Sequence, residues 1–320
     1  MEDQLHRLLL EEIKKTQLKT NEVVRVLMES LSLGKEAAYR RLRSDVPFTL
    51  QEAAVIAKKL SISLDDLIGV DLEKSKTLRI KLPDFVAPDE SGRHMFTDFI
   101  AFYESISQMK TTETGMVTNA LPQEIFSKYD LITKLNIFRW QYYYSYEKRV
   151  PFKDLVVSEW VTDALKRQYV LAKNFKDSYY VFDQRIFIRL VKEIDFFESI
   201  GLIDEQSVQQ IKEELLALVG YLEELTITGE FTETGNKVSL YITDIEVPFS
   251  CAYIKADTVE YTLMKAFIMT SVTSFDREVF AKIRDWVFSS IRASTLITKS
   301  SDIERIAFFS RQRELIRALR

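Results

Sequence analysis

Residues 33–69 read LGKEAAYRRLRSDVPFTLQEAAVIAKKLSISLDDLIG, and this stretch decides the fold of the N-terminal part of the chain. Thr49 and Glu52 have the spacing of a capping box, which predicts a helix that begins near Leu50. Apolar residues then recur every three or four positions up to Leu60, as they do on the buried face of a helix.

Helices are also predicted on both sides of this one. Downstream, Ser63–Asp66 repeats the start signal of a short last helix, and Gly69 is suited to end it. Upstream, the segment 35–43 is helical in pattern, and Pro47 enforces a break after it. Another apolar stripe predicts a helix over residues 21–31, so only a few residues join it to the next helix.

The order of these helices resembles the lambda-repressor/Cro-like (XRE-type) helix-turn-helix domain. A further helix predicted at residues 4–18 gives five in all, and the Ala37–Ala38 pair and the closing KKLSISLDDLIG are similar to that family. The resemblance covers about the first 70 residues. It implies a DNA-binding domain over residues 1–70 of a cytoplasmic, bacterial-type transcriptional regulator. In the family a Ser or Thr often caps the recognition helix, whereas Gly34 stands there in this chain.

The segment 35–43 would be the recognition helix of such a domain. Ala38 and Leu42 lie four residues apart and are expected to face the core. Arginine can bind guanine through two hydrogen bonds, while Lys35 near the helix start and Arg43 can equally hold phosphates. The outward side carries the side chains that we predict to contact double-stranded DNA: Lys35, Glu36, Tyr39, Arg40 and Arg43.

The positive charge of this region is local. Residues 1–70 contain acidic and basic side chains in about equal number, whereas DNA-binding modules are typically basic. Because a fold does not fix a function, two alternatives stay open. In the first, the chain is a protein–protein interaction adaptor whose helix-turn-helix does not bind DNA. In the second, the larger part is an enzyme linked to the small domain.

The composition narrows the class of protein. With 320 residues, 46% hydrophobic and 29% charged, the chain is long enough for two ordinary globular domains. The single cysteine, Cys251, lies in an apolar stretch and is typical of a protein from a reducing cytoplasm. The chain has only two histidines, His6 and His94, and together with one cysteine they do not have the spacing of a zinc site. No run approaches the roughly 20 apolar residues of a membrane span. We therefore expect a cytoplasmic protein with no metal, no cofactor and no membrane partner.

Residues 71–92 read as a linker, because Pro83, Pro88 and Gly92 interrupt any regular element, with one short strand expected at 77–82. Residues 93–320 are predicted to form a mainly helical domain with a small antiparallel β-meander, so the chain as a whole is mainly α. Helices are expected at about 93–110, 130–148, 158–174, 181–199, 204–225, 276–291 and from 303 to the end, and strands at 237–242, 249–256 and 261–270.

The larger domain contains no sequence motif that identifies a reaction. A phosphate-cradling glycine-rich loop, a G-x-S-x-G elbow and an H-E-x-x-H pair are all missing, so we do not expect an enzyme. The aromatic segment Trp140–Tyr146 is better explained as core or interface than as a ligand pocket. We expect this domain to dimerise the chain, to sense an unidentified small-molecule or protein effector, or both.

Overall fold

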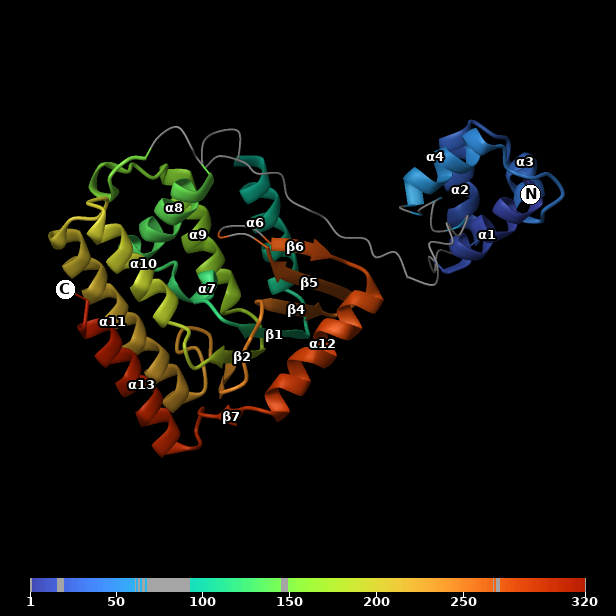
Figure 1. The fold of residues 1–320 in the computed structure, drawn as a ribbon. Helices are drawn as coiled ribbons and strands as arrows, with labels where there is room; N and C mark the ends of the chain where they lie inside the picture. Colours follow the sequence, from blue (N-terminus) through green and yellow to red (C-terminus); the bar gives the residue numbers. More distant parts are fainter. Residues whose placement is uncertain are drawn as a thin grey trace. The chain divides into compact units, whose positions relative to one another are not determined.

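The computed structural model describes residues 2–15, 20–60, 62, 64, 67, 93–144, 149–266, 268 and 271–319. The chain divides into two compact units, Met1–Thr77 and Leu78–Arg320 (Figure 1). The predicted linker at 71–92, its strand at 77–82 and the helix stop at Gly69 lie outside the described residues.

The N-terminal unit is a small helical bundle. Its helices are α1 (Glu2–Lys15), α2 (Thr20–Leu31), α3 (Lys35–Leu42) and α4 (Leu50–Leu60). Leu9, Leu27 and Ile56 come from α1, α2 and α4 and are fully buried together, which is the packing that the apolar stripes predict. Leu64 and Leu67, both helical, pack onto the same cluster; the rest of the expected fifth helix lies outside the described residues.

The C-terminal unit contains a seven-stranded mixed sheet. Its strands are β1 (Thr112–Thr118), β2 (Asp177–Asp183), β3 (Lys237–Thr243), β4 (Cys251–Ala256), β5 (Val259–Lys265), β6 (Ser271–Ser274) and β7 (Thr295–Leu296), in the order β6-β5-β4-β1-β2-β3-β7. β1, β2 and β3 are parallel neighbours. β4, β5 and β6 extend the sheet from β1 as antiparallel strands, and β7 pairs antiparallel with β3.

Helices cover both faces of this sheet (Figure 1). They are α6 (Arg93–Ser107), α7 (Gln123–Phe126), α8 (Asp130–Tyr144), α9 (Glu159–Ala172), α10 (Ile188–Ser199), α11 (Glu205–Thr228), α12 (Arg277–Arg292) and α13 (Asp302–Arg317), with the 3-10 turn η2 (Phe152–Asp154). On one face, Val181 and Tyr253 pack with Val287 of α12. On the other face, Tyr180 and Phe182 belong to the core that α8, α10, α11 and α13 complete.

The prediction of a small antiparallel β-meander is wrong. The unit is mainly helical but has a sizeable sheet whose centre is parallel, because β1 and β2 join β3. No strand was predicted where β1 lies, and residues 181–183 of β2 fall inside the predicted helix at 181–199, whose observed part is α10.

Strand β2 escapes the sequence pattern because both of its faces are buried. Tyr180 and Phe182 face one core and Val181 faces the other, so apolar and polar residues do not alternate along it. A short continuous apolar run of this kind cannot be told from a helical segment by its period. Its hydrogen-bonding partners lie far along the chain, since Asp177 pairs with Glu113 and with Lys237.

Candidate nucleic-acid interface

The joint between α2 and α3 is short and well defined. Ser32 adopts a left-handed backbone with φ 53°, and the N–H of Leu33 donates to the carbonyl of Met28 at 3.3 Å, a bond of the Schellman type that ends α2. Gly34 then precedes α3 in an extended conformation, and no side chain caps the helix there. The first amides of α3 therefore have no side-chain acceptor at the cap and are available to water or to an anion.

One side of α3 faces the core and the other faces solvent. Ala38 is fully buried and Leu42 packs against the same cluster, as their spacing predicts. Tyr39 is half-buried, and its hydroxyl lies 3.5 Å from Oδ1 of Asn21 on α2. The four other predicted DNA-contacting residues, Lys35, Glu36, Arg40 and Arg43, have exposed side chains.

The exposed cations of α3 differ in their partners. Arg43 pairs with Glu36 at 3.0 Å and with Asp45 at 3.1 Å. The hydrogen bond to Glu36, and after it the bond to Asp45, raise the pKa of the Arg43 guanidinium. Lys35 and Arg40 make no ion pair with any residue in the described part of the chain. Their positive charges are thus the two on this face that a phosphate or base can meet without displacing an acid.

Arg41 positions α3 and was not singled out by the sequence. Its Nη2 lies 2.6 Å from Oε1 of Glu52, and its Nε lies 3.3 Å from Oε2. Glu52 also accepts from the N–H of Thr49 at 2.8 Å, while its own N–H donates to Thr49 Oγ1 at 3.2 Å, so the predicted capping box forms. Burial raises the pKa of Glu52, but the bonds from Arg41 and Thr49 outweigh it and the pKa is lowered.

This link could not be found from periodicity, because its partners stand 11 residues apart on different helices. A second polar contact holds the segment that follows α3. The N–H of Phe48 donates to Nδ1 of the buried His6 at 3.1 Å, and the two rings contact each other, which ties α1 to the segment between α3 and α4. Two polar contacts therefore hold α3 and the segment after it to other helices of the N-terminal unit.

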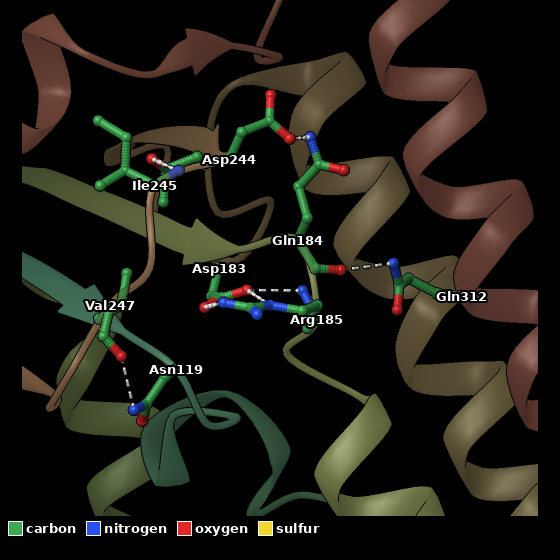
Figure 2. Close-up of polar contacts among 9 residues, drawn as sticks. Asn119, Asp183, Gln184, Arg185, Asp244, Ile245, Val247 and Gln312 are labelled. Carbon is green, nitrogen blue, oxygen red and sulfur yellow. Dashed lines mark hydrogen bonds and ion pairs between the residues drawn. The ribbon is translucent and has the colours of Figure 1, made fainter.

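Polar side chains also gather where the parallel strands of the C-terminal unit end (Figure 2). Arg185 binds Asp183 through Nε and Nη2, both at 3.1 Å, and Gln184 donates to Asp244. Burial raises the pKa of Asp183, but the bonds from Arg185 outweigh it and the pKa is lowered. Asn119 donates to the carbonyl of Val247 at 2.9 Å. The bond from Gln184 to Asp244 joins the ends of β2 and β3. Because these groups are hydrogen-bonded to one another, they contain no free acid–base pair.

Cys251 and Trp140, the first residue of the aromatic segment Trp140–Tyr146, are buried in the C-terminal unit. Cys251 is a buried free thiol in β4, and burial raises its pKa to about 12, so it stays protonated at neutral pH. Trp140 is buried, and Tyr142 packs against Phe197 at 4.9 Å between ring centroids. Tyr143 is exposed, and the side chains of 144–146 lie outside the described residues.

Within the described ranges, no group of three or more His, Cys, Asp or Glu side chains is placed to hold a metal ion. Helices in the same ranges are too short or too polar to cross a membrane. Comparison with models of protein families, with curated proteins and with solved structures found no match to this chain.

Proposed function

We propose that this chain is a sequence-specific, DNA-binding transcriptional regulator whose N-terminal unit contacts double-stranded DNA through α3. The observation that carries the proposal is the exposed face of α3, which follows a short turn from α2. On this face Lys35 and Arg40 form no ion pair with any residue that the structure describes. A helix presented in this way can enter the major groove, where arginine and lysine bind base edges and phosphates.

The C-terminal unit has the role of an effector or dimerisation domain in this proposal. One short recognition helix gives few contacts, whereas two copies related by a twofold axis span half-sites roughly 34 Å apart. The chain then acts as a homodimer on a palindromic site. Its domain organisation, its bacterial-type regulation and its place in the cytoplasm belong to the same proposal.

The first experiment is recovery of bound sequences from a random library of double-stranded DNA with the purified full chain, at two salt concentrations. A palindromic sequence should be enriched, and affinity should fall as salt rises because bound phosphates release counterions. The double variant Lys35→Ala/Arg40→Ala should lose the enrichment and keep the thermal unfolding of the parent.

The matched control is Lys58→Ala/Lys59→Ala. Both lysines are exposed in the last turn of α4, so this variant removes the same charge from the same unit. It should keep the enriched sequence. An equal loss of enrichment in both variants would show that the binding is general electrostatic attraction. If the α3 variant kept its affinity for the enriched sequence, α3 would not be the DNA-binding helix.

A protein-interaction adaptor is the second candidate, and one observation favours it. Glu36 and Asp45 offset the charge of Arg43, so the exposed face of α3 is of mixed sign. Such a face can dock on a protein surface with complementary charges. A folded chain that enriches no DNA sequence at either salt concentration would support this candidate.

A further inference from the structure

A cavity of about 310 Å³ lies at the edge of the sheet where β1 and β5 end. Val117, Cys251 and Met264 form one row across β1, β4 and β5, so the residues that follow β1 and β5 emerge at the same edge. Ligands of α/β proteins bind in crevices outside the carboxyl ends of strands. The polar side chains of the cavity are Asn119, Asn136, Arg139, Arg189, Glu193 and Lys265.

The charges in this cavity do not balance. Arg139 forms an ion pair with Glu193 and donates through Nη1 to Oδ1 of Asn136 at 3.3 Å, so the acid of the cavity is already neutralised. Arg189 and Lys265 make no ion pair with any residue that the structure describes. Two cations that form no ion pair within the described part of the chain thus border one concave space.

Lys265 lies in an unusual setting. Its side chain lines the cavity and is exposed to solvent. Desolvation by the surrounding protein, and after it the nearby Arg139, lower the pKa of the Lys265 ammonium to about 8, while Glu124 and Glu193 oppose the shift. An anion in the cavity would offset the repulsion between Lys265 and Arg139 and would favour the charged lysine.

The rest of the cavity is apolar. Phe126 of α7, Ile132 of α8 and Leu190 of α10 line it and are otherwise buried. A mostly apolar wall with a few placed polar groups is the usual make-up of a small-molecule site, and the volume lies at the lower end of the range for such sites, roughly 300–1,000 Å³.

We propose that this cavity binds a small organic anion. Its carboxylate or phosphate contacts Arg189 and Lys265, and its apolar part packs on Phe126, Ile132 and Leu190. Arginine and lysine both bind these groups by charge-assisted hydrogen bonds. This inference does not depend on DNA binding by the N-terminal unit, because every residue in it belongs to the C-terminal unit.

The test uses the full chain and two fluorescent probes with the same aromatic skeleton. One is 8-anilinonaphthalene-1-sulfonate, an apolar anion, and the other is N-phenyl-1-naphthylamine, its uncharged counterpart. The parent protein should bind the anionic probe more tightly. Equal or tighter binding of the neutral probe would overturn the proposal, and this comparison needs no variant.

Substitution then locates the site. Lys265→Met/Arg189→Gln should weaken binding of the anionic probe by about tenfold or more, as expected for the loss of two charge-assisted contacts. The affinity for the neutral probe should not change. The control Lys282→Met/Arg277→Gln removes the same charges from exposed positions on α12 and should bind like the parent. An unchanged dissociation constant in the cavity variant would refute the site.

Competition separates the possible anions. Hexanoate, hexyl phosphate and 1-hexanol share one alkyl chain, so each is titrated against the bound anionic probe. Displacement by hexanoate or by hexyl phosphate identifies the group that the cations select. If 1-hexanol competes as well as either anion, or if neither anion competes, the assigned ligand class is wrong.

Discussion

Arg40 and Arg43 offer a comparison within one helix surface. Both are exposed and lie three residues apart, and both were predicted to contact DNA. Arg43 is held by Glu36 and Asp45, whereas Arg40 forms no ion pair with the residues that the structure describes. Replacing each arginine by alanine removes one identical charge, so any difference in DNA affinity reports on these partners.

Arg40→Ala should have the larger effect. Loss of one phosphate contact reduces the slope of log affinity against log salt by about 0.9, which changes the affinity loss between 50 and 200 mM salt by about 3.5-fold. If Arg40 binds a guanine edge, the variant also loses about 1–3 kcal/mol, or about 5- to 160-fold, on the selected sequence. Arg43 must release two acids before it reaches a phosphate, so Arg43→Ala should change the slope by clearly less.

Fluorescence anisotropy of the enriched duplex at three salt concentrations measures both quantities. Glu36→Gln provides the converse, because it frees Arg43 from one partner and should strengthen binding. Thermal unfolding of each variant checks that the exposed substitutions leave the fold intact. An equal or larger loss with Arg43→Ala would refute the argument from ion pairing, and an unchanged affinity in both variants would place the DNA contact elsewhere.

Three further predictions concern stability and titration. In Gly115→Ala the new Cβ would lie 2.4 Å from Cε1 of the buried Tyr253, so the C-terminal unit should lose about 1–3 kcal/mol in urea unfolding, whereas Gly220→Ala, which meets no atom within 4 Å, should not. Because the pKa of Glu52 is lowered by folding, its carboxylate stabilises the N-terminal unit above pH 4.5, the ordinary pKa, and this stabilisation is lost as pH falls through the pKa of the folded state. Glu52→Gln should therefore reduce the loss of stability on acidification, measured by circular dichroism. Since an anion binds charged Lys265, affinity for the anionic probe should fall as pH rises through about 8, and Lys265→Met should remove that step.

The N-terminal helices could be predicted because each carries its own local signature. The capping box of Thr49 and Glu52 forms as expected, and the buried position of Ala38 follows from its spacing to Leu42. These signals act within one helix, so a single sequence contains them. The bond from Arg41 to Glu52 joins two helices and has no such signature.

The spacing of a capping box in the sequence does not always produce a capping box in the structure. Ser301 and Glu304 have the spacing of a capping box, and α13 does begin at Asp302. Ser301 nevertheless has a left-handed backbone and makes no capping hydrogen bond. The apolar face of α13, with Phe308 and Phe309 fully buried, therefore fixes this helix more than its first turn does.

The cavity could not be predicted from the sequence because β1 was not predicted as a strand of the sheet. The cavity joins Asn119 after β1 to Lys265 at the end of β5, and no periodicity relates residues so far apart. Their proximity follows once β1, β4 and β5 are placed in one sheet, because β5 then runs parallel to β1 and ends at the same edge. The step that the sequence does not show is the pairing of β1 with β4, whose partners lie more than 130 residues apart, as Val117 and Cys251 do. Without β1 placed in the sheet beside β4, the sequence does not show that Asn119 and Lys265 reach the same edge.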